Sequence, residues 1–167
     1  MENNFNITIA KTEKDFSEAK VLFLEYAKEL NLDLCFQNFD KELKEITIQY
    51  AEPSGVLFLL RKDIVSVGCV GLRKFKHTSP ENEADKFSIG EMKRLYIKKE
   101  FRGKGWSRKL AEEVLQHAKN MKYKTVRLDT LPQMKEAISL YLSLGFKEIK
   151  PYRFNPVEGT KYMELKF

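Results

Sequence analysis

The chain has 167 residues, of which 43% are hydrophobic and 12% aromatic, so it can form one compact core and lacks the composition of a disordered protein. Its formal net charge of +6 favours anionic partners without separating nucleic acid from a phosphorylated small molecule. It contains no run of about 18 apolar residues and its first residues lack a basic segment. We therefore expect no membrane span, no signal peptide and a cytoplasmic location.

Two cysteines and two histidines are the residues to consider for disulfides and metals. Cys35 and Cys69 both have apolar neighbours in sequence, which predicts two buried free thiols in a reducing compartment. His77 and His117 have no cysteine or acidic residue at metal-ligand spacing. We therefore expect no metal site.

The first 31 residues predict a strand followed by a helix. Residues 5–10 alternate between apolar and polar, as in a half-buried strand. Thr12 with Asp15 three residues later resembles a capping box, and apolar residues then recur at helical spacing up to Asn31. This helix should turn one apolar stripe towards the core.

The next segment predicts a second helix and a hairpin. Apolar residues keep helical spacing over 39–50, which indicates one helix. Apolar runs over 56–60 and 64–72 flank the short polar segment 61–63, which indicates two antiparallel strands. The polar segment 74–85 is expected to be a loop.

The second half predicts a β-α-β unit. A long strand is expected over 86–98, a helix over 103–121 and another strand over 124–131. Two strands joined by one helix begin parallel, so we expect an α/β fold with a mixed sheet and helices packed on it.

The last segment predicts one more helix and two strands. Helical spacing continues over 133–144, with Pro132 before the helix and Gly145 after it. Strands are expected over 146–149 and 161–167, separated by a loop rich in proline and aromatic residues. No internal repeat or linker divides the chain, so residues 1–167 should form a single domain.

The start of the 103–121 helix indicates an anion site. The chain reads Arg-Gly-Lys-Gly-Trp-Ser-Arg-Lys-Leu over 102–110. Cations at a helix N-terminus are unfavourable by about 0.3–1 kcal/mol each, because the helix dipole is already positive there. Glycines let the backbone approach a ligand closely, and the free N–H groups of the first turn bind phosphate. The pattern therefore predicts a bound phosphate or pyrophosphate.

Several motifs together resemble the GNAT family of acyl-CoA-dependent N-acetyltransferases. In chain order they are Glu91-Met92-Lys93-Arg94-Leu95-Tyr96-Ile97, Phe101-Arg102-Gly103-Lys104-Gly105-Trp106-Ser107, Leu128-Asp129-Thr130, Ala137-Ile138-Ser139-Leu140-Tyr141 and Leu144-Gly145-Phe146. The resemblance implies a single N-acetyltransferase domain with a coenzyme A-binding core at about 86–146. It also implies a mostly antiparallel sheet whose central parallel pair is splayed for coenzyme A, with helices on both faces.

The resemblance implies acetyl-CoA as co-substrate and no metal. The pyrophosphate would bind the turn formed by Arg102, Gly103, Lys104, Gly105, Trp106 and Ser107, with Trp106 contributing only its amide. Backbone N–H groups would bind the thioester and the pantetheine arm, from Leu95, Tyr96 and Ile97. Ser107 stands where glycine or alanine is usual, and Met134 stands where many relatives have an asparagine that contacts the cofactor.

Glu91 is the candidate general base, because an amine with a pKa near ~10.4 must lose a proton before it attacks. In a regular strand it would share a face with apolar side chains, namely Phe87, Ile89, Leu95 and Ile97. Such surroundings would raise its pKa. The alternative is a structural carboxylate paired with Lys93 or Arg94. The resemblance favours the base, acting directly or through water.

Tyr141 is the candidate general acid for the departing thiolate. A tyrosine at helical spacing is by itself more typical of a packed core. The resemblance assigns the hydroxyl to proton donation, because it occupies the position of the family's usual acid.

The resulting hypothesis is direct acetyl transfer from acetyl-CoA to a primary amine, with a small molecule as the favoured acceptor. A protein amine, and a non-catalytic coenzyme A-binding sensor, stay open as alternatives. A nucleic-acid-binding domain is not expected, because no binding motif for DNA or RNA accompanies the charge. The acceptor and the acyl-chain preference are not predicted, and a homodimer stays open. Acidic residues of the first half would attract a cationic acceptor or be simply solvated, namely Glu25, Glu29, Asp33 and Glu42.

Overall fold

The computed structural model describes residues 4–75 and 89–167. Its strands are β1 (Phe5–Ile9), β2 (Val56–Lys62), β3 (Val65–Lys74), β4 (Ile89–Ile97), β5 (Thr125–Thr130), β6 (Lys147–Ile149) and β7 (Lys161–Lys166). The longer helices are α1 (Glu13–Leu30), α4 (Trp106–Asn120) and α5 (Lys135–Ser143), and the shorter ones are α2 (Phe39–Lys44) and α3 (Ile46–Gln49). Two 3₁₀ turns complete the order, η1 (Leu34–Gln37) and η3 (Lys99–Phe101).

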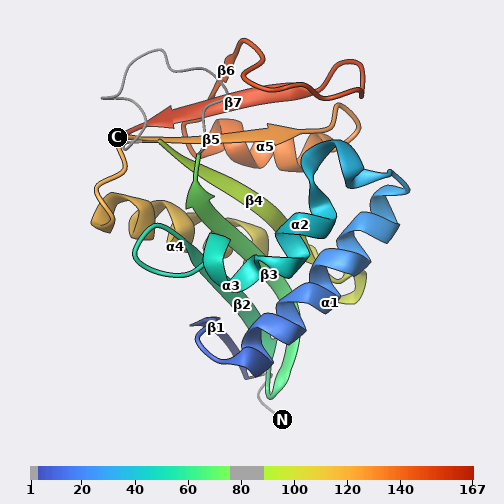
Figure 1. The fold of residues 1–167 in the computed structure, drawn as a ribbon, viewed down its shortest axis with the longest axis vertical. Coiled ribbons are helices and arrows are strands. Elements are labelled where there is room, and N and C mark those ends of the chain that lie inside the picture. Colours follow the sequence, from blue (N-terminus) through green and yellow to red (C-terminus); the bar gives the residue numbers. More distant parts are fainter. Residues whose placement is uncertain (1–3, 76–88) are drawn as a thin grey trace.

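The strands form one sheet in the order β1-β2-β3-β4-β5-β7-β6 (Figure 1). Among the described strands, only β4 and β5 are parallel, and every other neighbouring pair is antiparallel. The predicted mixed α/β fold, with a mostly antiparallel sheet and one central parallel pair, is therefore confirmed.

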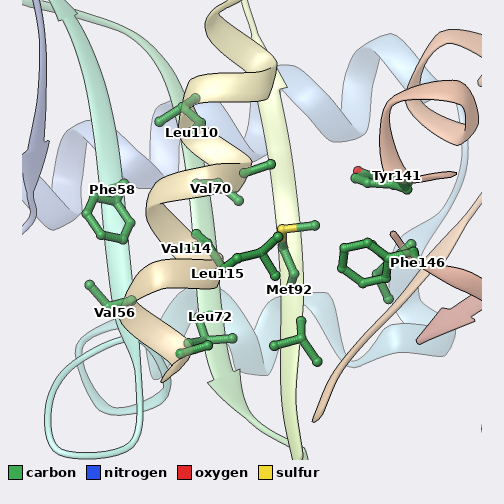
Figure 2. Packing of buried hydrophobic residues seen from close by; sticks show 14 of the residues in the cluster. Val56, Phe58, Val70, Leu72, Met92, Leu110, Val114, Leu115, Tyr141 and Phe146 are labelled. Carbon is green, nitrogen blue, oxygen red and sulfur yellow. The ribbon is translucent and has the colours of Figure 1, made fainter. Parts of the chain in front are cut away.

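Helices cover both faces of the sheet and create two apolar cores. On one face, α1 and the α2–α3 segment cover buried side chains of β2 and β3, including Leu57, Leu59 and Cys69. On the other face, α4 places Leu110, Val114 and Leu115 over Val56, Phe58, Val70, Leu72 and Met92 (Figure 2). Each fully buried leucine or valine contributes about 1.5–3 kcal/mol. Tyr141 and Phe146 extend this second core towards β5 (Figure 2).

The predicted capping box of α1 is confirmed. The Asp15 backbone N–H donates to Thr12 Oγ1 at 3.2 Å, and Asp15 Oδ2 accepts from the Thr12 backbone N–H at 2.9 Å. The helix ends at Asn31, whose φ of 50° lies in the left-handed region. Both ends of α1 are thus encoded locally, as the sequence pattern indicated.

Three expectations for the first half are wrong in detail. Residues 39–50 form two short helices, because the backbone leaves helical geometry at Glu45 (φ −102°, ψ 17°). The hairpin turn lies at 63–64, since β2 continues to Lys62 and Asp63 adopts a positive φ of 55°. Cys35 is exposed, because the 3₁₀ turn buries the neighbouring Leu34 instead, whereas Cys69 is buried as expected.

Two predicted segments fall partly outside the described residues. The loop expected over 74–85 lies outside them from residue 76 onwards, and so do His77 and Phe87. The strand expected from 86 is described from Ile89. Within residues 4–75 and 89–167, no helix is long and apolar enough to cross a membrane.

A bulge in β4 gives Glu91 different surroundings from those predicted for a regular strand. Lys93 pairs with Gly71 and Tyr96 with Cys69, so two residues of β4 oppose one of β3, and Arg94 takes a positive φ of 59°. Beyond the bulge, Ile97 packs with Met92 in the core under α4. Glu91 precedes Met92 and therefore points to the opposite face, not to the face of Leu95 and Ile97 as expected.

A buried ion pair ties α2 to this bulge. Arg94 donates to Glu42 at 2.6 and 3.0 Å, and the Tyr50 hydroxyl donates to the same carboxylate at 2.6 Å. The Tyr50 ring reaches this position because Gly71 has no side chain, and a Cβ there would lie 2.4 Å from the ring. Burial alone would raise the pKa of Glu42, but the Arg94 charge and hydrogen bonds outweigh it and hold the pKa at about 2.

We predict that Glu42→Gln lowers the free energy of unfolding by about 3–5 kcal/mol at pH 7, because it leaves the Arg94 charge buried without its partner. Urea denaturation measures this loss. Glu45→Gln on the same segment is the control, since Glu45 pairs with Lys41 near the surface at 3.8 Å and should lose less than about 1 kcal/mol. Equal small losses in both variants would contradict a stabilising role for the buried pair.

The same pair predicts a pH dependence. The pKa of Glu42 is about 2 in the folded chain against an ordinary value of 4.5. The stabilisation is therefore complete above pH 4.5 and is lost as the pH falls towards 2, a change of about 3 kcal/mol. The difference in stability between the original chain and Glu42→Gln should narrow over this range.

Candidate active site

A cleft opens where β4 and β5 separate. The two strands pair at three positions, Ile89–Thr125, Gly90–Val126 and Glu91–Arg127, although both continue further. The cleft has a wide arm of about 640 Å³ and a narrow arm of about 40 Å³. Both arms are lined by the same five residues where they meet, namely Tyr26, Leu30, Leu95, Met134 and Tyr141. The two arms are therefore adjacent at these residues, and together they are called the channel.

The wide arm contains the N-terminus of α4. Gly105 caps this helix with a φ of 78°, and Gly103 has a φ of 75°, so both adopt the left-handed conformation that glycine tolerates best. No side chain caps the helix. The first amides of a helix have no internal partner, so those following Gly105 are available to a ligand in the cleft. This arrangement can hold an anion.

Two of the cations near this turn, Arg102 and Lys109, have partners within the protein. Arg102 donates through Nε to the Ile97 carbonyl at 2.7 Å, and its guanidinium pairs with Glu29 of α1 at 2.7 Å. The hydrogen bond from Arg102 lowers the pKa of Glu29. Lys109 lies 4.5 Å from the centre of the Trp106 ring, which itself stacks on Phe5. The backbone amides are thus the least committed donors at the helix start.

Most predicted coenzyme A contacts line the same arm. They are Leu95, Tyr96 and Ile97 of β4, Arg102, Gly103, Gly105, Trp106 and Ser107 of the turn, and Met134 before α5. Lys104 is exposed and does not line it. Residues separated by up to about forty positions are therefore brought to one cavity, as expected for a single ligand.

Tyr141 stands at the junction of the two arms. It is buried, lines both of them, and packs its ring against Phe146 (Figure 2). Among the described residues, none hydrogen-bonds its hydroxyl. Burial raises the pKa of Tyr141, so the hydroxyl keeps its proton at neutral pH. Its location fits both a core residue and a proton donor.

Glu91 is held by cations and lines neither arm. Its carboxylate accepts from Arg73 Nε at 3.0 Å and from Arg153 of the loop before β7. Lys93 Nζ lies 4.0 Å away and does line the narrow arm. The sequence predicted Lys93 or Arg94 as the partner of Glu91. The contacts with Arg73 and Arg153 arise only in the folded chain.

The narrow arm contains polar residues to which the sequence assigned no role. Lys93 Nζ lies 3.2 Å from both Asp129 Oδ1 and Gln37 Oε1, and Asn155 Nδ2 donates to Asp129 Oδ2 at 3.3 Å. These four residues come from β4, β5, η1 and the loop before β7. One sequence feature could have indicated this polar cluster. Asp129 lies at the carboxyl end of a parallel strand, where ligands bind in open α/β sheets.

The acidic residues considered as attractants for a cation are already engaged. Glu25 pairs with Lys98, Glu29 with Arg102 and Glu42 with Arg94. Asp33 caps η1 by accepting from the Cys35 amide. In the described part of the chain, no group of three or more histidine, cysteine or acidic side chains is arranged to hold a metal ion.

The chain is similar to known acetyltransferases over most of its length. A model of the acetyltransferase (GNAT) family matches residues 23–146. An uncharacterised N-acetyltransferase of Schizosaccharomyces pombe is 34% identical, over 98% of this chain and 95% of the relative. Another from Dictyostelium discoideum is 30% identical, over 96% of this chain and 98% of the relative.

Solved structures share the fold. A GNAT-family acetyltransferase from Staphylococcus aureus matches with a TM-score of 0.75 at 20% identity, covering 98% of this chain and 99% of that one. A GNAT-family acetyltransferase from Elizabethkingia anophelis, crystallised with acetyl-CoA bound, matches with a TM-score of 0.65 at 19% identity, covering 99% and 100%.

We predict that Ser107→Asp weakens coenzyme A binding by about tenfold or more while leaving the fold intact. An acidic side chain in the first turn of α4 favours the helix dipole, but it repels a phosphate at the same amides. Titration calorimetry with coenzyme A and thermal unfolding measure the two effects. Ser17→Asp, on the exposed surface of α1, is the control that adds the same charge elsewhere. Unchanged affinity in Ser107→Asp would place the phosphates away from this turn.

Proposed function

Because the chain belongs to the acetyltransferase (GNAT) family, we propose that it transfers the acetyl group of acetyl-CoA to a primary amine of a small molecule. The observation that carries the proposal is that Tyr141 lines both of the adjacent arms of the channel. Its wide arm suits the donor and its narrow arm suits the acceptor. The reaction would take place where the two meet.

The wide arm has the features that coenzyme A requires. The free amides at the start of α4 offer donors for a pyrophosphate, and the volume of about 640 Å³ is that of a typical ligand site. Beyond Glu91, the edge of β4 that faces β5 has no ladder partner among the described residues. We propose that the amides of Leu95, Tyr96 and Ile97 bind the pantetheine arm and polarise the thioester carbonyl.

The proposed chemistry is direct transfer. The amine nitrogen attacks the carbonyl carbon, a C–N bond forms, and the C–S bond of the thioester breaks. Tyr141 donates its hydroxyl proton to the departing sulfur, which leaves as the free thiol. The proton that the amine releases restores the tyrosine through water in the channel. The raised pKa of Tyr141 supports this assignment, because the residue is protonated before transfer.

Glu91 is proposed to act indirectly. Its carboxylate is occupied by Arg73 and Arg153 and lies outside the channel lining. Lys93 Nζ stands between this carboxylate, at 4.0 Å, and Asp129, at 3.2 Å. The proton that the ammonium form of the acceptor loses before attack would therefore reach Glu91 through Lys93 or a water molecule, whereas the proton lost after attack restores Tyr141.

A small acceptor suits the narrow arm better than a protein side chain does. Its volume is about 40 Å³, and leucines of the α1–η1 segment and Asn155 of the loop before β7 enclose it. A lysine on a folded protein would have to displace these segments to reach Tyr141. A free-thiol release assay with acetyl-CoA and a panel of amines tests the proposed function.

We predict that Tyr141→Phe lowers kcat by about 10²-fold or more while coenzyme A affinity changes little, because only the proton donor is lost. Thiol release at saturating acetyl-CoA measures kcat. Tyr123→Phe is the matched control, since the Tyr123 hydroxyl donates to the Ser54 carbonyl outside the channel. Full activity in Tyr141→Phe would reject Tyr141 as the acid.

We predict that Glu91→Gln lowers kcat by about tenfold or more at pH 7 and that alkaline pH restores part of the loss. An amine with a pKa near ~10.4 becomes increasingly neutral as the pH rises, so it then depends less on a proton acceptor. The pH profile of kcat from 7 to 9.5 measures this recovery. A constant fold-loss across the profile would indicate that Glu91 only maintains the structure.

A further inference from the structure

The narrow arm presents one buried cation and one buried anion side by side. Lys93 of β4 and Asp129 of β5 are 4% and 3% exposed in their side chains, and their charged atoms are 3.2 Å apart. Burial lowers the pKa of Lys93, and the Asp129 charge opposes that effect. Both side chains line the arm next to Tyr141. A ligand in this arm therefore meets both charges together.

Each member of the pair has unused hydrogen-bonding capacity. The Lys93 ammonium carries three N–H donors and uses two, to Asp129 Oδ1 and Gln37 Oε1. The Asp129 carboxylate has about four acceptor positions and accepts from Lys93, Gln37 and Asn155. These contacts are 3.2–3.4 Å long, whereas charge-assisted hydrogen bonds prefer about 2.7–2.9 Å. One donor and one acceptor are thus available to a ligand.

The surrounding charges disfavour an acceptor that is only cationic. The ion network linked to this pair contains four cations, Arg73, Lys93, Arg94 and Arg153, and three carboxylates, Glu42, Glu91 and Asp129. Its net charge within the described residues is therefore +1. A polyamine would add further positive charge to this network, whereas a carboxylate on the acceptor would reduce the excess.

We propose that the acceptor is a free α-amino acid, with its carboxylate bound to Lys93 and its amino group bound to Asp129. This inference rests on the proposed function and names the acceptor class for the same site. An α-amino acid carries both charges on one carbon, which matches two partners only 3.2 Å apart. Amines with a distant carboxylate, or with none, cannot satisfy both partners at once.

The remaining wall of the arm limits the side chain of this amino acid. Much of it is apolar, including Leu30, Leu32, Leu34 and Met92, although Arg94 and Thr130 also line the arm, and the free volume is about 40 Å³. An uncharged, compact side chain would contact these leucines, whereas a charged one would be buried without a partner. The preferred acceptors are therefore small apolar amino acids.

The test compares each amino acid with its amide and its decarboxylated amine in the thiol-release assay, using the full chain. Suitable sets are alanine, valine, leucine and methionine, with spermidine as the polycation. At least one amino acid should exceed both of its analogues in kcat/KM by about tenfold or more. The reason is that neither analogue carries a carboxylate that can bind Lys93. Better turnover of spermidine, the amides or the decarboxylated amines would overturn the inference and leave the proposed function intact.

A charge-balanced variant assigns the preference to these residues. Lys93→Gln alone leaves a buried carboxylate without its partner, so the double variant Lys93→Gln/Asp129→Asn is used, which removes both charges and keeps polar side chains at both positions. It should lower kcat/KM for the amino acid about tenfold or more while coenzyme A affinity stays the same. The control is Lys161→Gln/Glu148→Gln, which removes an exposed pair at 2.8 Å. An unchanged preference in the first double variant would overturn the inference.

Binding separates failure of this inference from failure of the proposed function. If no amine releases thiol, titration calorimetry of each amino acid into the coenzyme A-loaded chain decides the matter. Binding that the Lys93→Gln/Asp129→Asn variant abolishes would support the amino-acid site even though acetyl transfer is absent. No binding of any amino acid would overturn the site as well.

Discussion

β4 and β5 hydrogen-bond only as far as Glu91 and Arg127, and the cleft exists because the two strands separate beyond that point. Beyond that point, one edge of β4 has no strand partner among the described residues, and Figure 1 shows the two strands diverging. Backbone groups at such an edge must be satisfied by a ligand or by water.

The bulge at Arg94 lies in the same part of β4. It moves Ile97 to the face of α4 and leaves Glu91 and Lys93 on the face of α1, so one local irregularity divides the strand between core and site.

The buried charges around β4 add directional contacts between segments of the chain, including α2, which also packs in a hydrophobic core. Glu42 of α2 binds Arg94, while Glu91 binds Arg73 of β3 and Arg153 of the loop before β7. Replacing buried ion pairs by apolar residues often changes stability little, because desolvation offsets much of their attraction, although removing one partner alone is costly. Their directional hydrogen bonds instead fix where α2 and the terminal loop lie. The terminal loop and η1 both line the narrow arm, so the network contributes to the shape of the proposed acceptor site as well as to the stability of the fold.

The sequence predicted what depends on local pattern. The capping box of α1, the apolar face of α4 and the order of strand, helix and strand in the second half all follow from residues close together in the chain. It failed where geometry depends on distant partners. The 39–50 helix breaks at Glu45, and that break lets Tyr50 and Glu42 meet over Gly71. Glu91 was expected on an apolar face because a regular strand was assumed, and strand alternation contains no signal for the bulge. Gln37 and Asn155 meet Asp129 from opposite ends of the chain, which no local motif records.

The two arms of the channel therefore differ in how they can be recognised. The wide arm, proposed to bind the donor, offers backbone amides after a glycine turn, and these depend on a short contiguous segment, Arg102 to Ser107. Its cations are largely paired within the protein, Arg102 with Glu29 above all. The excess positive charge in the sequence first indicates an anion site, but the backbone amides are better placed than these cations to bind the anion. The acceptor arm uses side chains from four separate segments. Donor chemistry can thus stay constant while replacement of one distant residue, such as Gln37 or Asn155, changes the acceptor. Knowledge of the acceptor must come from the assembled fold, because only there do Lys93 and Asp129 become neighbours.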